Sequence, residues 1–117
     1  MSNIIKQYDI WIASLNPAIG SDPGETRAVV ILQSDILHQA KHTSTIVCLI
    51  YSQTKETFSI LRLQITPNTN NGLKKPSYII CDQIRAIDAM RLQERIGRLD
   101  EETIDRLNTS IKAILTL

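Results

Sequence analysis

The C-terminal part of the chain decides the fold, because its hydrophobic period changes there from that of a strand to that of a helix. One run reads Tyr78-Ile79-Ile80-Cys81-Asp82-Gln83-Ile84, and the end of the chain, from Asp100, reads DEETIDRLNTSIKAILTL. The first run is rich in the β-branched and aromatic residues typical of strands. In the second, Asp100 can cap a helix. The apolar residues that follow it recur at helical spacing, at Ile104, Leu107, Ile111, Ile114 and Leu115.

The segment between these two runs is ambiguous. Leu92, Ile96 and Leu99 fit one face of a helix, whereas Gly97 favours a strand or a break. Local signals leave both interpretations of residues 89–99 open.

Upstream of residue 78 the chain is dominated by strand signals. Four predicted strands cover Tyr8 to Leu15, Ala28 to Leu32, Thr45 to Tyr51 and Phe58 to Ile65. A short helical turn is expected in the polar stretch 34–43. Asn71-Gly72, between Pro67 and Pro76, is a strong hairpin signal. We therefore predict a single domain over residues 1–117, mainly β with helices (α+β), folded as a small barrel or curled sheet with an amphipathic C-terminal helix.

Composition bounds the possible partners. The chain has 117 residues, 43% hydrophobic and 21% charged, as expected of a folded domain. A formal net charge of +1 gives no general attraction to nucleic acid, so such a partner must be argued from local patches. We expect no membrane association and a cytoplasmic location, since the sequence lacks an apolar run of membrane-spanning length and a signal-peptide pattern at its start.

Two cysteines and two histidines give no metal-site pattern. Cys48 and Cys81 each lie in an apolar run, which predicts reduced core thiols. Their spacing from His38 and His42 matches no known ligand set, so we expect no metal and no cofactor. Paired histidines can perform acid–base chemistry, but in a polar connector solvated side chains are the favoured interpretation.

Three segments together resemble the MazF/PemK family of bacterial toxins, in the family's order and along nearly the whole chain. The first comprises Asp9-Ile10-Trp11, Leu15-Asn16-Pro17, Gly20-Ser21-Asp22-Pro23-Gly24-Glu25-Thr26-Arg27 and Val29-Val30-Ile31. The second comprises Thr45-Ile46-Val47 and Ser52-Gln53-Thr54-Lys55. The third comprises Gly72-Leu73-Lys74-Lys75, Asp82-Gln83-Ile84-Arg85-Ala86-Ile87-Asp88 and Ile96-Gly97-Arg98-Leu99-Asp100-Glu101-Glu102.

The resemblance implies a plasmid-maintenance-toxin barrel related to the SH3-like folds. It also implies a homodimer that acts as the toxin of a type II toxin–antitoxin system. The implied activity is metal-independent, sequence-selective cleavage of single-stranded RNA (mRNA), leaving 2′,3′-cyclic phosphate and 5′-hydroxyl ends. The implied partner is a cognate antitoxin whose disordered tail covers the active groove.

Three positions depart from the family pattern. Tyr51 stands where a Thr with a catalytic part in several members usually precedes the serine, and Ala28 replaces the usual Pro after the arginine. Ile80 lies where one branch of the family has an Arg. The exchange at Tyr51 puts the rate of catalysis in question.

Metal-free cleavage needs a cation on the phosphate, and Arg27 suits this task. Its planar guanidinium matches phosphate oxygens and stays charged at any working pH. The alternative is an ordinary ion pair with Asp22 or Glu25. Ser52 can donate a hydrogen bond to phosphate, and Tyr51 either contributes its hydroxyl or belongs to the core. An extended strand would place Ser52 and Tyr51 on opposite faces.

A general base must accept the 2′-hydroxyl proton. Asp82 matches the base of one family branch, and Asp22 matches a catalytically important acidic loop residue of another. For both, a solvated surface carboxylate is the competing interpretation, because a carboxylate acts as a base near neutral pH only when its surroundings raise its pKa.

The remaining candidates would bind substrate. Gln83 and Arg85 would share one strand face, where Gln can read a base edge and Arg can hold a phosphate or stack on a base. Lys55, Lys74 and Lys75 could form a basic rim along the RNA backbone, although such lysines commonly serve only solubility.

Two alternatives to an active ribonuclease remain. The toxin fold also serves non-enzymatic gyrase poisons, which act through C-terminal aromatic residues, but this chain ends Ala113-Ile114-Leu115-Thr116-Leu117 without one. A catalytically weakened member that only binds RNA or a partner is the other, and Tyr51 is the residue that favours it.

Overall fold

A computed structural model of the chain describes residues 4–15, 25–52 and 60–117. The strands within these ranges are β1 (Asp9–Ser14), β2 (Thr26–Ile31), β3 (Ser44–Tyr51), β4 (Arg62–Ile65), β5 (Ser77–Asp88) and β6 (Leu92–Arg98). The helices are α1 (Asp35–Gln39) and α2 (Glu101–Leu115), and a 3-10 turn, η1 (Ala89–Arg91), precedes β6.

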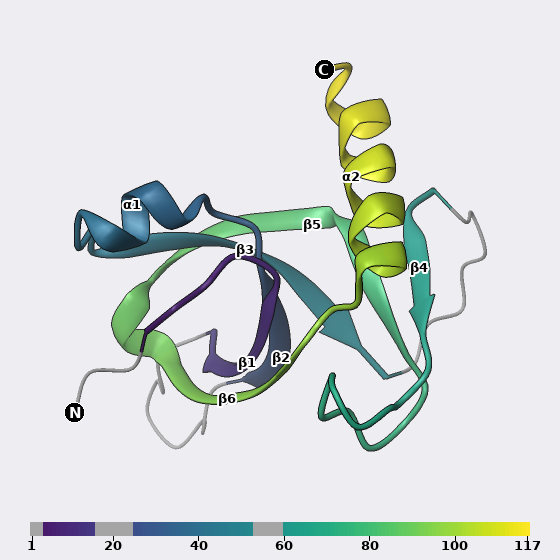
Figure 1. The fold of residues 1–117 in the computed structure, drawn as a ribbon, viewed down its shortest axis with the longest axis horizontal. Helices are drawn as coiled ribbons and strands as arrows, with labels where there is room; N and C mark the ends of the chain where they lie inside the picture. The colour runs from purple at the N-terminus through teal and green to yellow at the C-terminus, as the bar shows by residue number, and fades with distance from the viewer. Residues whose placement is uncertain (1–3, 16–24, 53–59) are drawn as a thin grey trace.

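The strands form one antiparallel sheet in the order β4-β5-β3-β2-β1-β6. It curls strongly, and α2 stands at one side (Figure 1). The predicted α+β class, mainly β with a C-terminal helix, is confirmed. Of the predicted barrel or curled sheet, the structure has the curled sheet: it is not closed, since β4 and β6 stand at opposite ends of the strand order.

Alternation along the strands divides the core into two clusters. The helix-facing cluster includes Ile10, Val30 and Cys48 with Ile104 and Leu107 of α2. The inner cluster holds their strand neighbours, which point to the other face of the sheet: Trp11, Ala13, Leu15, Val29, Ile31, Val47, Leu49 and Ile87. Burying both faces explains why the central strands are nearly continuous apolar runs.

Both cysteines lie in the helix-facing cluster as free, buried thiols, as predicted. Burial in an apolar environment raises the pKa of the Cys48 thiol and of the Cys81 thiol, because it disfavours their thiolate forms.

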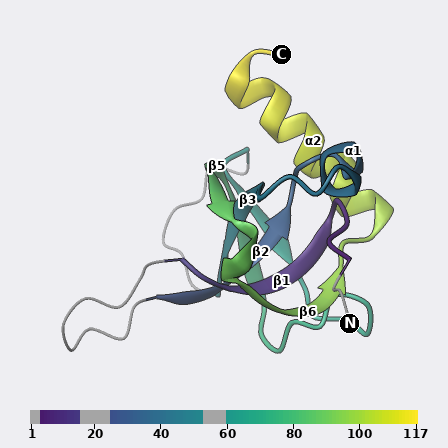
Figure 2. The same cartoon turned by 90° about the vertical axis from the view of Figure 1, so that its left-hand side faces the viewer.

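The C-terminal helix forms where its local signals predict. The Asp100 side chain accepts a hydrogen bond from the Thr103 backbone N–H at 2.8 Å and so caps the first turn. Ile104 and Leu107 are buried in the helix-facing cluster, and Ile111 and Ile114 pack on its edge. Leu115, predicted to belong to the same stripe, is 53% exposed. The C-terminal end of α2 projects beyond the sheet (Figure 2), which explains the exposure.

Residues 92–98 are a strand, β6, which resolves the ambiguous segment. Gly97 explains why. A Cβ at Gly97 would lie 2.3 Å from the Asn71 carbonyl carbon, so only glycine lets the 66–76 loop pack on β6. Gly72, the neighbour of Asn71 in this loop, has φ +70°, and a Cβ at this position would lie 1.9 Å from the Ile96 carbonyl oxygen of β6.

Asn71-Gly72 therefore lies in a longer connection rather than in a two-residue turn. Strands β4 and β5 pair antiparallel, as a hairpin requires, but residues 66–76 join them. The Asn71 side chain is buried and holds this loop together, accepting from the Asn68 and Leu73 backbone N–H groups and donating to the Thr66 carbonyl.

Two strand predictions need correction. The expected strand from Phe58 begins only at Arg62; residues 58 and 59 lie outside the described residues, and Ile60 is 44% exposed. The prediction that Gln83 and Arg85 share one face assumes regular alternation, which fails in β5 because the register with β3 shifts between Ile80 and Ile84. This bulge leaves Cys81 buried and Asp82 exposed. Of the helices described, none is long and apolar enough to cross a membrane.

Candidate functional site

The pairing of β2 with β3 brings together Arg27, from the start of β2, and Tyr51, from the end of β3. The Arg27 guanidinium carbon lies 3.8 Å from the centre of the Tyr51 ring. Its Nε lies 3.0 Å from Glu25 Oε2, so the ion pair foreseen as an alternative is present. The Arg27 side chain is nevertheless 32% exposed, which leaves donor groups available to a ligand.

Ser52 lies on the other face of the same strand end. It lines a pocket of about 210 Å³ with Arg27, Thr26, Ala28 and Ile50. Ile50 belongs to the helix-facing cluster, whereas Tyr51 packs against the inner cluster. The predicted opposite orientation of Tyr51 and Ser52 thus follows the alternation of the strand, and Arg27 is adjacent to both residues.

The 66–76 loop brings two of the predicted lysines near this pocket. Leu73 and Ser77 line it, and Lys74 and Lys75 lie between them in sequence with exposed side chains. The Ser77 hydroxyl donates to the Lys75 carbonyl at 2.9 Å, which fixes the end of the loop. Two other predicted site residues, Asp22 and Lys55, lie outside the described residues.

Asp82 lies further along the sheet, in the bulge of β5. Its Oδ1 accepts a hydrogen bond from Arg62 Nη1 of β4 at 2.8 Å. Gln83 and Arg85 are both exposed, as substrate contacts must be. Arg85 is in register with Val47, but Gln83 belongs to the bulge, so regular alternation does not place the two on one face.

Sequence reasoning missed the residues that extend this surface across the sheet. Tyr78 of β5 is directly opposite Tyr51, and Gln64 of β4 is directly opposite Tyr78. Residues paired in this way project from the same face. Arg62 lies two residues before Gln64 on β4 and so projects from the same face. Only the strand order reveals this row, because these four strands lie side by side as β4-β5-β3-β2, which is not their order in the sequence.

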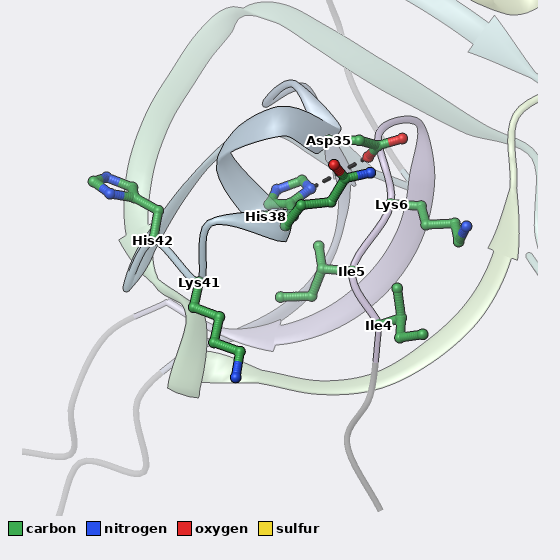
Figure 3. A pocket seen from close by; sticks show the side chains of 8 residues that line it. Ile4, Ile5, Lys6, Asp35, His38, Lys41 and His42 are labelled. Atoms are coloured by element: carbon green, nitrogen blue, oxygen red, sulfur yellow. Dashed lines mark hydrogen bonds and ion pairs between the residues drawn. The ribbon is translucent and has the colours of Figure 1, made fainter.

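A second pocket, of about 540 Å³, lies between the N-terminal segment and α1 (Figure 3). It is lined by Ile4, Ile5, Lys6, Asp35, His38, Gln39, Lys41 and His42.

The histidine prediction is wrong for His38, whose side chain is only 7% exposed. Its ring nitrogens lie 3.3 Å from Asp35 Oδ1 and 3.1 Å from Thr45 Oγ1. His42 is exposed as expected and points away from His38 (Figure 3), so the two do not form a catalytic pair. His38 links α1 to β3 instead.

Asp35 anchors the N-terminal segment to α1. Its Oδ1 accepts the Gln7 backbone N–H at 2.7 Å, and mainly for this reason its pKa lies below its ordinary value. Among the described residues, no three His, Cys, Asp or Glu side chains gather in a way that could hold a metal ion.

Comparison with known proteins agrees with this architecture. Residues 6–115 match the family described as PemK-like, MazF-like toxin of type II toxin–antitoxin system. The chain is 32% identical over 114 residues to Endoribonuclease EndoA of Bacillus subtilis, covering 97% of each chain. It is 30% identical over 114 residues to Endoribonuclease MazF of Staphylococcus saprophyticus, covering 97% of this chain and 93% of that one.

Solved structures share the fold. A MazE–MazF complex from Deinococcus radiodurans superposes with a TM-score of 0.81 at 12% identity, over 99% of each chain. The Mycobacterium tuberculosis toxin MazF-mt6 gives 0.75 at 24% identity, over 93% of this chain and 97% of that one. The family match over residues 6–115 and the two sequence relatives lead to one conclusion: the chain belongs to the PemK-like, MazF-like toxin family of type II toxin–antitoxin systems.

Proposed function

We propose that this chain is the toxin of a type II toxin–antitoxin system and a sequence-selective endoribonuclease that cleaves single-stranded RNA without a metal ion. The observation that carries the proposal is Arg27, a partly exposed guanidinium stacked on Tyr51 and sharing a pocket with Ser52. The family match and the two relatives named endoribonucleases support the reaction class.

RNA carries its own nucleophile, which is why the residues present can suffice. The 2′-oxygen attacks the adjacent phosphorus and the bond from phosphorus to the 5′-oxygen breaks. The products are a 2′,3′-cyclic phosphate and a 5′-hydroxyl. One proton must leave the 2′-hydroxyl and another must reach the 5′-oxygen.

Arg27 would stabilise the negative charge that develops on the phosphate oxygens in the transition state. The Tyr51 ring packs against one face of the guanidinium in a cation–π contact and holds it in place. Ser52, from the pocket side, would donate a hydrogen bond to a phosphate oxygen. Asp82 and Asp22 remain our proposals for the proton acceptor. Asp82 would act with one oxygen already bound to Arg62.

We propose that the RNA substrate and the antitoxin bind to the same surface, the one around Arg27. Lys74 and Lys75 would guide the RNA backbone at the pocket rim, with Lys55 in the neighbouring segment, and Gln83 and Arg85 would contact bases or phosphates. A cognate antitoxin would silence the toxin by laying a disordered tail in this groove. Two structural relatives that are antitoxin complexes support such a partner.

We also propose a homodimer. Apolar side chains on α1 and β3 are unusually exposed, with Ile36 at 74%, Leu37 at 42% and Ile46 at 41%. Light scattering of the purified protein tests this directly: a dimer has twice the 13.2 kDa mass of the chain. A monomer at micromolar concentration would contradict the proposal.

The decisive experiment incubates the purified, antitoxin-free protein with a long unstructured RNA in EDTA and maps the ends. We expect discrete cuts that leave 5′-hydroxyl groups, lost in Arg27→Ala and strongly reduced in Arg27→Lys, which keeps the charge but not the planar fork. Arg106→Ala is the matched control, because Arg106 is exposed on α2, away from β2 and β3.

Two results would overturn the proposal. Folded Arg27→Ala that cleaves like the parent protein would remove Arg27 from the mechanism. An absence of cutting by the folded parent protein would reject the ribonuclease, and inhibition of gyrase would then be measured.

A further inference from the structure

We propose that Tyr78 is a base-stacking surface for the RNA nucleotide next to the phosphate held by Arg27, with Gln64 beside it to contact the edge of that base. This inference rests on the proposed ribonuclease function and names residues by which the same site would hold its substrate. It starts from the strand register.

The register places four side chains in one row across the sheet. Arg27 lies over the Tyr51 ring at 3.8 Å, Tyr51 is paired with Tyr78, and Tyr78 is paired with Gln64. Paired residues have Cβ atoms about 5 Å apart on one face. Arg27 is thus separated from Tyr78 by two strand spacings, about 10 Å. A nucleotide with its phosphate at Arg27, or the next nucleotide, can reach Tyr78 with its base.

The three tyrosines of the chain differ in what holds them. Tyr8 packs against the helix-facing cluster and exchanges hydrogen bonds with Asn108, at 3.2 and 2.9 Å. Tyr51 packs against the inner cluster and lies beneath Arg27. Tyr78 is half-buried but belongs to neither cluster, and no hydrogen bond of its hydroxyl is recorded within the described part of the chain.

These differences assign separate roles to the two tyrosines of the row. The guanidinium of Arg27 covers the Tyr51 ring, so Tyr51 positions Arg27 rather than offering its own face to a base. The next row along the same face, Val29, Leu49 and Ile80, is buried. A partly exposed aromatic ring that packs in neither cluster of the described residues, beside an exposed amide, is suited to recognition of an unpaired base.

Gln64 adds the possibility of selectivity. It is exposed at the outer end of the row, on β4, with an amide that can donate and accept at once. Stacking alone tolerates any base, because every base has a flat face. A hydrogen bond from Gln64 to the edge of the stacked base would favour some bases over others.

The test measures binding of an RNA oligonucleotide that spans a mapped cut and carries 2′-deoxyribose at the scissile position, so that it cannot be cleaved. We expect Tyr78→Ala to bind about tenfold more weakly or worse. Tyr78→Phe should bind normally, since it keeps the ring. Tyr78→Leu keeps apolar bulk but not the flat face, and should be weakened almost as much as Tyr78→Ala. Tyr8→Phe is the control for loss of a tyrosine hydroxyl elsewhere.

A second measurement identifies the contact. Bases near the cut are replaced one at a time by abasic nucleotides, and each oligonucleotide is titrated against the parent protein and Tyr78→Ala. One abasic position should weaken binding to the parent protein and have no further effect in Tyr78→Ala, because each change removes the same contact. Gln64→Ala should reduce the differences in affinity among the four bases at that position, because only stacking, which tolerates any base, remains.

The outcomes separate this inference from the proposed function. If the parent protein cleaves RNA but folded Tyr78→Ala and Tyr78→Leu bind like it, the inference is wrong and the ribonuclease proposal stands. The same holds if every abasic effect persists in Tyr78→Ala. If the parent protein neither cleaves nor binds RNA, both fail together.

Discussion

Two charged clusters lie at opposite ends of the β1–β2 hairpin, and only one of them contains a buried charged side chain. At one end, Asp9 is the buried residue, with its side chain 2% exposed, while its partners Arg95 and Arg98 are 48% and 43% exposed. At the other end, Arg27 is 32% exposed and its carboxylate partner, Glu25, is 36% exposed. Both contain an arginine and a carboxylate, yet their surroundings give them different roles.

The Asp9 end is held by several contacts. Asp9 Oδ2 lies 3.2 Å from Arg95 Nε and accepts the Lys6 backbone N–H at 3.2 Å. Arg98 lies opposite Asp9 in the β1–β6 register and donates to the Gln7 carbonyl at 2.8 Å. A buried carboxylate must keep such partners, because leaving it without them is costly. The Arg27 end has fewer contacts of this kind and keeps donors exposed, which suits a ligand.

The largest expected effect falls on activity at the Arg27 end. Arg27→Ala should lower the cleavage rate about 10²–10³-fold, the loss typical of removing one preorganised donor from a developing anion. The free energy of unfolding should change by less than about 1 kcal/mol, since the ion pair is partly exposed. A quenched fluorescent oligonucleotide measures the first quantity and urea titration the second. If Arg27→Ala lowered the free energy of unfolding by as much as it raised the activation free energy of cleavage, the contrast between the two ends would be contradicted.

At the Asp9 end we expect the opposite result, a loss of stability without a loss of activity. Asp9→Ala should reduce the free energy of unfolding by about 2–3 kcal/mol, because it removes a buried acceptor and leaves two arginines and a backbone N–H without their partner. Cleavage per folded molecule should be retained. Asp105→Ala, at an exposed carboxylate on α2, is the control in the same urea titration. A loss below 0.5 kcal/mol would show that Asp9 is not the structural member of the comparison.

A third carboxylate, Asp100, sharpens the contrast because its main partner is a backbone N–H group rather than an arginine. Its pKa lies below the ordinary value of 3.8, mainly because it accepts the Thr103 backbone N–H. Its stabilising effect is therefore complete above the ordinary value and is lost as the pH falls through the lowered pKa in the folded state. Asp100→Ala should cost about 1 kcal/mol near neutral pH.

Asp100→Asn isolates the charge in this cap. Asparagine caps a helix about as well as aspartate, so stability at pH 7 should change little, but part of the loss on acidification should disappear. Urea titrations of both proteins at pH 7 and pH 3 check this. An unchanged pH dependence would mean that the Asp100 carboxylate does not couple to folding.

The smallest effect is expected for alkylation of the two cysteines, which are buried in the core between the charged clusters. Burial raises the pKa of both thiols, so Cys48 and Cys81 should stay unmodified by iodoacetamide at pH 8 in the folded protein and react after unfolding in urea. Mass spectrometry reads the outcome. Rapid labelling of the folded protein would show that the sheet opens locally between the two charged ends.

Several parts of the molecule could be predicted from sequence because their causes are local. The C-terminal helix follows from Asp100 and from the apolar residues Ile104, Leu107, Ile111 and Ile114, all within one element. The Arg27–Glu25 pair was foreseen as an alternative, since the two residues are close in sequence. The resemblance to toxin sequences indicated the family, which the comparisons then showed.

Other features depend on contacts between distant segments. Residues 92–98 form a strand because Gly97 accommodates the loop that contains Asn71 and Gly72, and no pattern within 89–99 states this. His38 was expected in solvent, but the packing of α1 on β3 places it against Thr45.

By itself, the sequence determined the elements whose signals lie within a few residues: the hydrophobic period of the strands, the cap and stripe of α2, and the motif that contains Arg27. Only the tertiary structure decided which side chains share a surface. Arg27, Tyr51, Tyr78 and Gln64 form a row because β2, β3, β5 and β4 are neighbours in the sheet. The physical reason is that strand order is set by burying both faces of the sheet and closing long loops, whereas side-chain period is set residue by residue along each strand.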